Sequence, residues 1–552
     1  MINNHTFTPK IPHHKMLHAI FGVLLFAFSQ CVNAKPHIHN RVVRELAEHD
    51  QIGLLITMKS ANVSAANHPE ALAMAISGMR SQQLAYTMED LADTRIYHKA
   101  RGEYVFEVIT RHHAQSRDRL LLALPEGTEI EQSVPLSNSF VIRGGKDIVQ
   151  TLAQMDDIDE VFTTSGFKVD LPKPASNRPP LIQSLMQRMI GAKDEDLQDA
   201  DLPEKNIQWN VKKIGAERVW RQGGDRSRGQ GIRYAIADTG VAYLHPNINA
   251  NYLGRKQDGK YDHNYAWYDG VRKPVAPGGH TQSRCGVASN VPCDDQGHGT
   301  HVTSTAVGAD GYGVAPGARW MACRNMDNGL GAPVTYLICL NFFLAPHDLQ
   351  GKNPRPDLRP HVIGNSYGCP DSEGCSKRAM RAAVEGLRAA GIFMSVSAGN
   401  EGPRCSTVDA PPALEPLVFS VGATDNSDNL ARFSSRGPVS IDGQQWRKPD
   451  ISAPGVGILA AYPGDTMRRL SGTSMASPHV SGAVVLLSAV CPCLERDNER
   501  LQAVLQATAK HLVPPAGESL CGDDTPSSVP NNFFGYGRID LVSAMSVCKE
   551  LC

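Results

Sequence analysis

The chain of 552 residues is too long for one compact core, so we expect two or three folded units. Its 55 basic side chains balance 56 acidic ones, and nothing in the composition points to nucleic acid or an anionic membrane as the main partner. The function therefore has to be sought in particular motifs.

Residues 1–34 are predicted to be a signal peptide. Lys10 and Lys15 form a basic lead, residues 17–28 are an apolar core, and the small residues at 32–34 resemble a cleavage site after Ala34. The apolar core is too short to span a membrane, and no later stretch is long enough. We expect a secreted protein with no membrane attachment once this leader is removed.

The cysteines agree with export. The chain has 13 cysteines, and removal of Cys31 with the leader leaves an even number, which favours disulfides in an exported protein. Zinc is not predicted, because the Cys-x-Cys at 491–493 has no matching Cys or His pair nearby. The connectivity stays open, but we expect local bridges Cys285–Cys293, Cys323–Cys339 and Cys369–Cys375, and pairing of Cys491 and Cys493 with Cys521, Cys548 or Cys552.

Residues 35–170 carry mixed strand and helix patterns. Apolar runs predict strands at 104–109, 120–124, 140–142 and 160–162, and a helix is predicted at 146–155. The Pro-rich and then charged stretch 171–205 is predicted to be a linker in which processing occurs before Gln208. A separate binding domain that stays attached is the alternative interpretation of 35–170.

Residues 206–552 alternate strand and helix patterns, which indicates a parallel α/β sheet. Strands are predicted at 232–237, 320–324, 361–365, 392–397 and 418–421. A helix at 376–390 has its apolar residues on one face and ends at Gly391. The polar insert 255–294 is predicted to be a surface loop held by Cys285 and Cys293.

Four short motifs carry reactive side chains at strand ends or helix starts. Asp238 ends an apolar strand, His298 lies between two glycines at a helix start, Asn400 follows a strand, and Ser474 precedes an apolar helix. The first N–H groups of a helix lack partners and stabilise a negative charge, so a serine there is well placed to act as a nucleophile. In open α/β sheets, such positions gather at one edge of the sheet.

In their order Asp, His, Asn and Ser, these motifs resemble those of the subtilisin-like serine proteases over residues 208–541. The segments 262–265, 323–327 and 365–369 look most like the bacillopeptidase F type of that superfamily. The resemblance implies a three-layer α/β domain with a mostly parallel sheet at 206–552. It also implies that 35–170 is a small α+β (ferredoxin-like) propeptide that assists folding and inhibits the enzyme until it is cleaved.

The same resemblance assigns the chemistry of peptide hydrolysis. Ser474 would be the nucleophile, His298 its general base, and Asp238 the group that orients the imidazole. Asn400 and the backbone N–H of Ser474 would stabilise the oxyanion, and no cofactor is required. His301 and the histidine at 479 lie within predicted helices and are expected to be structural.

Substrate binding is predicted by matching further positions of the family. Ser366, Tyr367 and Gly368 correspond to the segment that pairs with the substrate and walls the primary specificity pocket, with Tyr367 as an aromatic wall. Asp409 falls where many members have glycine at the pocket floor. A carboxylate there, with Glu401 near the rim, favours Lys or Arg before the scissile bond.

Two departures from the family pattern stand out. Thr303-Ser304 replace a usual Ala-Gly pair, and we expect Ser304 to crowd the packing of its helix without removing a catalytic group. The segment from Thr305 to Pro316 is short and lacks the loop that wraps a high-affinity calcium ion, while Asn247 stands where another usual ligand lies. We do not predict that calcium site, although weaker calcium sites stay open.

The sequence thus predicts a secreted serine endopeptidase made as a self-processed zymogen. Its expected partners are polypeptide substrates and its own propeptide, and it is expected to be a monomer. Two other classes were considered: a non-catalytic binding protein on a protease scaffold, and a secreted esterase or lipase. The second class favours a Gly-x-Ser-x-Gly motif and the order Ser, Asp, His, which this chain does not follow.

Overall fold

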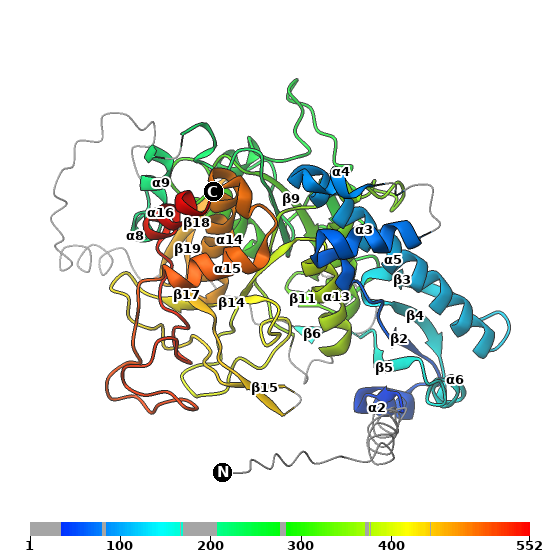
Figure 1. The fold of residues 1–552 in the computed structure, drawn as a ribbon. Coiled ribbons are helices and arrows are strands. Elements are labelled where there is room, and N and C mark those ends of the chain that lie inside the picture. The colour runs from blue at the N-terminus through cyan, green and yellow to red at the C-terminus, as the bar shows by residue number, and fades with distance from the viewer. Residues whose placement is uncertain are drawn as a thin grey trace, which may run out of the picture.

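The computed structural model describes residues 35–79, 84, 86–165, 167–168, 207–222, 224–275, 283–369, 375, 377–441 and 443–552. The predicted signal peptide at 1–34 and the predicted linker at 171–205 lie outside the described residues. The chain forms a large C-terminal α/β unit and a smaller N-terminal unit beside it (Figure 1).

The C-terminal unit is built on a seven-stranded sheet in the order β17-β14-β13-β12-β7-β9-β8. Every neighbouring pair of strands is parallel. The five predicted strands are all in this sheet. The strand bounds are β7 Arg233–Asp238, β8 Trp267–Asp269, β9 Arg319–Arg324, β12 Val362–Asn365, β13 Phe393–Ser397, β14 Phe419–Thr424 and β17 Ile451–Pro454.

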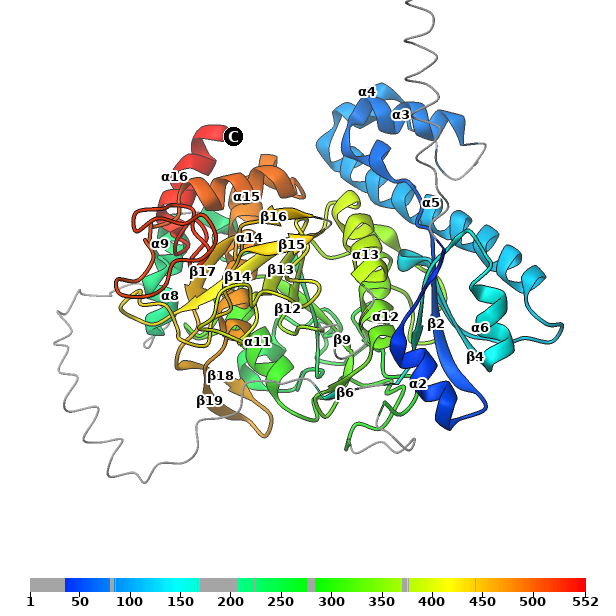
Figure 2. The same ribbon diagram turned by 90° about the horizontal axis from the view of Figure 1, so that it is seen from below.

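Helices cover both faces of this sheet. On one face lie α11 (His298–Val307) and α14 (Thr473–Val490), and on the other lie α12 (Pro333–Leu344) and α13 (Lys377–Ala389) (Figure 2). Successive residues of β7 alternate between the two cores, because strand side chains point to opposite faces. The predicted three-layer α/β fold is confirmed.

The helix α14 is 18 residues long and apolar enough to cross a membrane, but 94% of its apolar window is buried inside the protein. It is therefore the central core helix of the sheet unit. The other helices of this unit are α8 Trp209–Lys213, α9 Ala216–Gln222, α10 Pro246–Asn249, α15 Asn498–Ala507 and α16 Leu541–Leu551, with short 3-10 turns η3 Gly224–Arg226, η4 Pro356–Leu358 and η6 Pro492–Leu494. Its short strands are β10 Met326–Asp327, β11 Leu330–Gly331, β15 Val439–Ile441, β16 Gln444–Trp446, β18 Ile458–Tyr462 and β19 Thr466–Leu470.

The insert 255–294 is not only a surface loop. It contains β8, which pairs in parallel with β9 and is the last strand at this edge of the sheet. Trp267 of β8 is fully buried because it packs into the core. The predicted bridge Cys285–Cys293 does hold the rest of the insert.

Six disulfides link the twelve cysteines after residue 34. The three predicted local bridges are present. Cys491 and Cys493 pair with Cys548 and Cys552, so the C-terminal helix α16 is tied to the end of α14. The remaining bridge, Cys405–Cys521, spans 116 residues and was not predicted.

The N-terminal unit has a five-stranded sheet in the order β1-β5-β2-β4-β3. The pairs β5–β2, β2–β4 and β4–β3 are antiparallel, and the pair β1–β5 is parallel. The bounds are β1 His37–Ile38, β2 Ile52–Met58, β3 Ile130–Val134, β4 Ser139–Gly144 and β5 Ile158–Thr163, with helices α2 Asn40–Glu48, α3 Pro69–Gly78, α4 Met88–Ala92, α5 Thr94–Ala123 and α6 Lys146–Leu152, and the turns η1 Ser64–Asn67 and η2 Pro135–Ser137.

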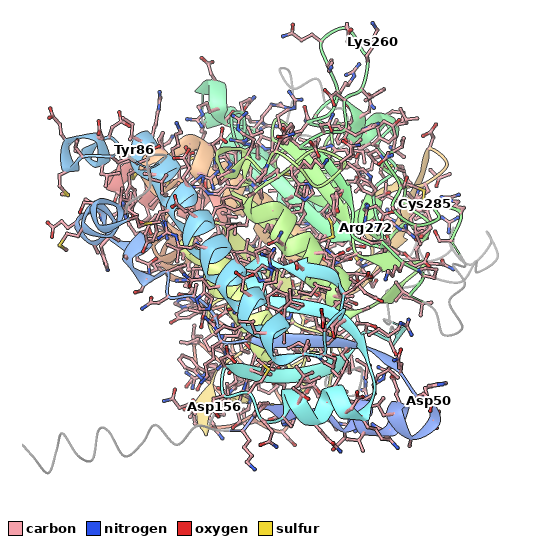
Figure 3. All side chains as sticks on the ribbon, turned by 90° about the vertical axis from the view of Figure 1, so that its right-hand side faces the viewer. Asp50, Tyr86, Asp156, Lys260, Arg272 and Cys285 are labelled. Carbon is pink, nitrogen blue, oxygen red and sulfur yellow. A yellow bond between two sulfur atoms is a disulfide. The ribbon has the colours of Figure 1, made fainter. Side chains whose placement is uncertain are left out.

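The predicted strands at 104–109 and 120–124 are wrong, because both runs lie in the 30-residue helix α5. Asp93 caps this helix by accepting hydrogen bonds from the N–H groups of Arg95 and Ile96. A short apolar run does not by itself distinguish a strand from a buried helix. In Figure 3, α5 runs across the front of the molecule from the region of Tyr86.

The two units share one apolar layer. Leu55, Val141 and Phe162 on one face of the N-terminal sheet belong to the same core cluster as α12 and α13. The other face packs on α2, α5 and α6. A further short strand, β6 (Phe167–Lys168), leaves this unit and pairs antiparallel with β11.

Candidate active site

Asp238 and His298 form a buried pair at the carboxyl end of the sheet. Asp238 is the last residue of β7, and His298 is the first residue of α11. Nδ1 of His298 lies 2.8 Å from Oδ1 and 3.0 Å from Oδ2 of Asp238, and neither side chain is exposed. Oδ1 also accepts the N–H of Thr239 at 2.7 Å. The carboxylate therefore holds one ring nitrogen and leaves Nε2 for another partner.

Two glycines give His298 its place. Gly297 has φ 104°, and a Cβ on it would lie 2.3 Å from the ring of Tyr462. A Cβ on Gly299 would lie 2.0 Å from the carbonyl oxygen of Gly240. Only glycine fits on both sides of the histidine, so the spacing seen in the sequence has a steric cause.

Asp294 organises this loop and was missed by the sequence analysis. Its Oδ1 accepts Thr239 Oγ1 at 2.9 Å and the N–H groups of Gln296 and Gly297 at 3.1 and 2.7 Å. Its Oδ2 accepts the N–H and Oγ1 of Thr300 at 2.9 and 2.5 Å. Burial raises the pKa of Asp294, and these hydrogen bonds act in the opposite direction. The sequence signal that could have identified this residue is an acidic side chain four positions before His298.

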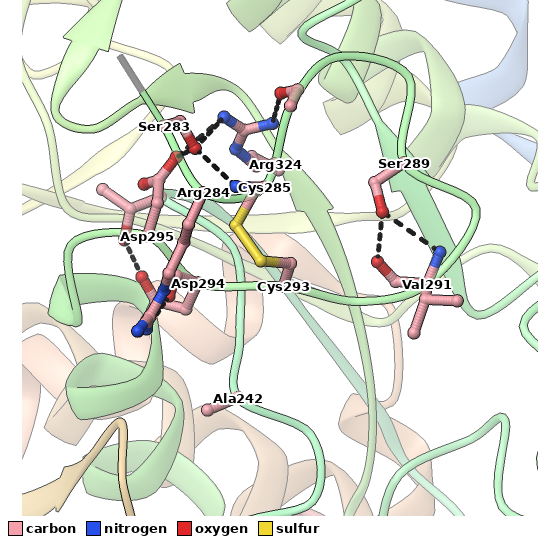
Figure 4. Close-up of a disulfide and its surroundings, with 12 residues drawn as sticks. Ala242, Ser283, Arg284, Cys285, Ser289, Val291, Cys293, Asp294, Asp295 and Arg324 are labelled. Carbon is pink, nitrogen blue, oxygen red and sulfur yellow. Dashed lines mark hydrogen bonds and ion pairs between the residues drawn. A yellow bond between two sulfur atoms is a disulfide. The ribbon is translucent and has the colours of Figure 1, made fainter. Parts of the chain in front are cut away.

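A buried arginine supports the neighbouring loop (Figure 4). Arg324, at the end of β9, lies 3.1 Å from Asp269, 2.7 Å from Asp295 and 2.8 Å from Asp327. Burial raises the pKa of Asp269, and the charge of Arg324 opposes this shift. The guanidinium thus joins the end of β8, the loop before His298 and the short strand β10.

Ser474 is the second residue of α14 and is 3% exposed. Its Oγ donates to the carbonyl oxygen of Ser366 at 3.0 Å, and Ser366 Oγ donates back to the carbonyl of Ser474 at 3.2 Å. Within the described residues, Nε2 of His298 has no hydrogen-bond partner. The serine and histidine therefore lie at the same sheet edge without a hydrogen bond between them.

Asn400 follows β13, and its amide orientation is determined by its neighbours. Oδ1 accepts the N–H of Thr473 at 2.9 Å and Oγ1 of Thr473 at 3.0 Å. Because a backbone N–H can only donate, this oxygen assignment is unambiguous. The amide Nδ2 stays available to an oxygen held at the start of α14.

The predicted pocket segments lie side by side. A Cβ on Gly368 would be 3.1 Å from Cβ of Ala410, and the N–H of Cys369 donates to the carbonyl of Pro411 at 3.0 Å. Asp409 is exposed next to this contact. The ring of Tyr367 differs from the expectation of an aromatic wall, because it is 2% exposed and stacks on Tyr336 at 4.4 Å.

Ser304 does not crowd its helix. Its Oγ donates to Oδ1 of Asn247 at 2.7 Å and accepts the N–H of Ala461 at 3.0 Å. Nδ2 of Asn247 donates to the carbonyl of Ala309 at 2.8 Å. The amide oxygen at the position of a usual calcium ligand is thus engaged within the protein, and the described residues contain no cluster of three or more His, Cys, Asp or Glu suited to a metal.

The two other conspicuous histidines are buried in helices. Nε2 of His301 donates to the carbonyls of Ile458 and Arg468 at 3.1 and 3.0 Å, and burial lowers the pKa of His301 to about 3. His479 bonds to Asn210 and to the carbonyl of Met475, both at 2.8 Å. Both histidines are thus buried and hydrogen-bonded to neighbouring segments of the chain, as expected for side chains that stabilise the packing.

This combination of fold and site defines a class of protein. The profile of the subtilase family matches residues 229–537, which include the four motifs. The chain therefore belongs to the subtilase family.

Individual relatives agree with this assignment. Bacillopeptidase F of Bacillus subtilis is 34% identical over 424 residues, which cover 75% of this chain and 26% of the relative. The subtilisin-like serine protease Pen ch 13 of Penicillium rubens is 35% identical over 214 residues, which cover 39% of this chain and 48% of the relative. The chain thus spans about a quarter of the first relative and about half of the second.

Replacing the buried carboxylate Asp294 by its amide is expected to lower activity through His298. The NH₂ group of the introduced amide would face N–H or O–H donors on whichever side it lies, so the loop before His298 would shift. We expect Asp294→Asn to lower kcat for a peptide substrate about 10–100-fold, because small misplacement of a catalytic base has effects of this size. Steady-state kinetics test this, with the exposed Asp310→Asn as control; unchanged kcat in Asp294→Asn contradicts it.

Proposed function

We propose that this protein is a secreted serine endopeptidase that uses Asp238, His298 and Ser474 as its catalytic residues. The observation that carries the proposal is the buried Asp238–His298 pair, whose free Nε2 lies at the sheet edge where α14 begins with Ser474. Membership of the subtilase family supports peptide-bond hydrolysis. Six disulfides support an extracellular location.

The reaction begins when the Ser474 hydroxyl leaves the carbonyl of Ser366 and turns to Nε2 of His298. His298 takes the hydroxyl proton as Oγ attacks the peptide carbonyl carbon, and Asp238 stabilises the imidazolium through Nδ1. Nδ2 of Asn400 and the N–H of Ser474 stabilise the oxyanion. His298 then gives its proton to the leaving amine, and water hydrolyses the acyl-enzyme by the same steps. No metal or cofactor takes part in this sequence.

The nucleophile is tested by the intact mass of the purified exported protein, wild type beside Ser474→Ala, each with and without a fluorophosphonate. We expect the wild type to lose its prodomain and to gain one adduct, while the variant stays full length and unlabelled. In peptide assays of the mature enzyme we expect a loss of about 10⁶-fold in kcat, the effect of removing this nucleophile in a subtilisin. Asn400→Ala should cost about 10²–10³-fold, as the corresponding change does there.

If wild type and variant both stay full length and unlabelled after another protease removes the prodomain, the catalytic assignment is wrong. A binding protein on a protease scaffold then becomes the better interpretation. An esterase would label but would hydrolyse esters and not peptides.

We also propose that residues 35–170 are an inhibitory prodomain with a ferredoxin-like fold, cut off by the enzyme itself within the linker. The order β5-β2-β4-β3 supports this fold. Pairing of β6 with β11 supports inhibition, because a strand paired at this edge occupies the course of an extended substrate. The protease would then have two partners, polypeptide substrates and its own prodomain, and it would act as a monomer.

The contact between prodomain and protease is partly polar. Arg101 of α5 donates to the carbonyls of Arg388 and Ala389 at 3.0 and 2.5 Å, where α13 ends. A cation is favourable there, because the last carbonyls of a helix lack partners. The N–H of Leu136 donates to Asn341 at 3.1 Å. These contacts support an inhibitor that is tightly bound.

His98 of α5 makes this contact sensitive to pH. Its carbonyl accepts a hydrogen bond from Arg359, but within the described residues neither ring nitrogen has a partner. The pKa of His98 is lowered to about 3, chiefly by burial and also by the charges of Arg496 and Arg101, while Glu495 opposes the shift. Protonation of His98 is thus disfavoured while the two units are in contact.

Acid is therefore expected to release the prodomain. His98 in the free prodomain should titrate near pH 6.5, so the complex binds fewer protons than its parts and weakens as the pH falls below that value. The loss from this group is about 10-fold in affinity at one pH unit below about 6.5. The affinity of the prodomain added in trans, measured as inhibition between pH 5 and 8, should fall with this pH dependence. The His98→Gln variant should reduce the pH dependence, and the control His37→Gln, at an exposed position, should leave it unchanged. An unchanged slope in His98→Gln contradicts the assignment.

We further propose that the pocket beside Ser366 and Gly368 accepts Lys or Arg. Asp409 supports this, because its exposed carboxylate has no partner among the described residues and adjoins the contact between Gly368 and Ala410. Glu401 accepts a hydrogen bond from Ser435 at 2.7 Å.

Peptides that differ only at the residue before the scissile bond test this pocket. We expect Arg and Lys to exceed Phe and Leu by about 10-fold or more in kcat/KM, because a carboxylate beside the pocket attracts a cationic side chain. Asp409→Ser should remove most of the difference, and Glu401→Gln should change it less. A preference of the wild type for Phe or Leu overturns the proposal.

A further inference from the structure

The hairpin β18–β19 lies beside the catalytic histidine. β19 ends at Leu470, four residues before Ser474. The hairpin is tied to α11 because His301 donates to the carbonyls of Ile458 and Arg468, and Ala461 donates to Ser304. Its position relative to His298 is therefore rigid.

One aromatic ring links the hairpin to the histidine loop. The hydroxyl of Tyr462 donates to the carbonyl of Gln296 at 2.6 Å, and its ring lies directly against Gly297. The guanidinium carbon of Arg468 lies over this ring, 4.4 Å from its centroid. Arg468 is exposed. Its charge therefore lies close to the residue that precedes His298.

The hairpin lies apart from β11. In Figure 1, β18 and β19 are well separated from β6 and β11. In the proposed function the acyl half of the substrate follows β11 and Ser366–Gly368. An extended substrate that passes Ser474 must therefore continue toward the hairpin with the half that leaves as the amine.

This side of the site has an excess of positive charge. Arg468 and Arg284 are exposed, and neither has a carboxylate partner among the described residues. Arg284 donates to the backbone carbonyl of Asp294 at 2.7 Å. Arg469 follows Arg468 in β19, so its side chain points to the opposite face of the hairpin, where it donates to the carbonyl of Gly457 at 2.9 Å.

The nearby carboxylates do not neutralise these cations. Asp294 is surrounded by its five donors, and Asp295 is paired with Arg324. Asp465 lies in the turn between β18 and β19 and forms no ion pair with Arg468 or Arg284 among the described residues. Burial raises the pKa of Tyr462, and the charges of Arg468 and Arg284 both oppose this shift, as expected of cations close to the ring.

We propose that Arg468, with Arg284 near it, makes the leaving-group side of the site selective for an acidic residue at one of the first two positions after the scissile bond. This inference rests on the proposed function and adds a substrate preference to it. Exposed cations attract a carboxylate through water, so the preference is moderate and is screened by salt. It acts as a selection among substrates and not as a requirement for cleavage.

Quenched fluorescent peptides test the inference on the mature enzyme. The peptides share one acyl half and carry Glu, Gln or Lys at the first or second position after the scissile bond. At low ionic strength we expect Glu to exceed Lys by about 5–10-fold in kcat/KM at one of these positions, and the ratio to approach one near 1 M NaCl. Arg468→Gln should lower the ratio to about 2 or less, with the Gln peptide cleaved at nearly the wild-type rate.

Arg218→Gln, an exposed arginine on α9, is the matched control and should keep the wild-type ratio. A structural defect in Arg468→Gln would slow all peptides equally, whereas loss of the preference changes only their ratio. Cleavage of all peptides without discrimination overturns the inference and leaves the proposed function intact. A wild-type ratio of Glu to Lys peptide in Arg468→Gln also overturns the inference. Failure of the wild type to cleave any peptide contradicts both the inference and the proposed function.

Discussion

The buried hydrogen bond between Asp238 and His298 is the contact on which the rest of the site depends. A carboxylate with no exposure is stable only if its oxygens are hydrogen-bonded, and here the imidazole and the N–H of Thr239 meet that need. The glycines beside His298, the five donors around Asp294 and the ring of Tyr462 all hold the histidine within reach of that carboxylate. The loop is thus rigid before any substrate arrives, as electrostatic catalysis requires.

The sheet supports this contact by bringing strand ends together. Because β7, β9, β12 and β13 are all parallel, Asp238, Arg324, Ser366 and Asn400 come from strands that end at the same edge. Arg324 binds three carboxylates at this edge, and breaking such a buried network is costly because a charge would be left unpaired. The end of β8, the loop before His298 and the short strand β10 are therefore coupled through one guanidinium.

The N-terminal unit covers the opposite face of α12 and α13 from the sheet. Its apolar contact resembles a domain core, whereas His98 and Arg101 place polar groups at the end of α13. Apolar burial with a polar edge is what the proposed inhibitory prodomain would need in order to bind firmly and later dissociate.

The sequence by itself determined the family, the parallel strands, the four motifs and the three local disulfides, because each depends on a short pattern of residues. It could not determine that 104–109 and 120–124 lie in α5, since a short apolar run fits a strand and a buried helix equally well. The tertiary structure decided the contacts of Asp294 with Thr239, of Tyr462 with Gln296, and of Ser474 with Ser366. Their partners lie 55, 166 and 108 residues apart in the chain, and only the packing of the sheet and its helices brings such groups within hydrogen-bonding distance.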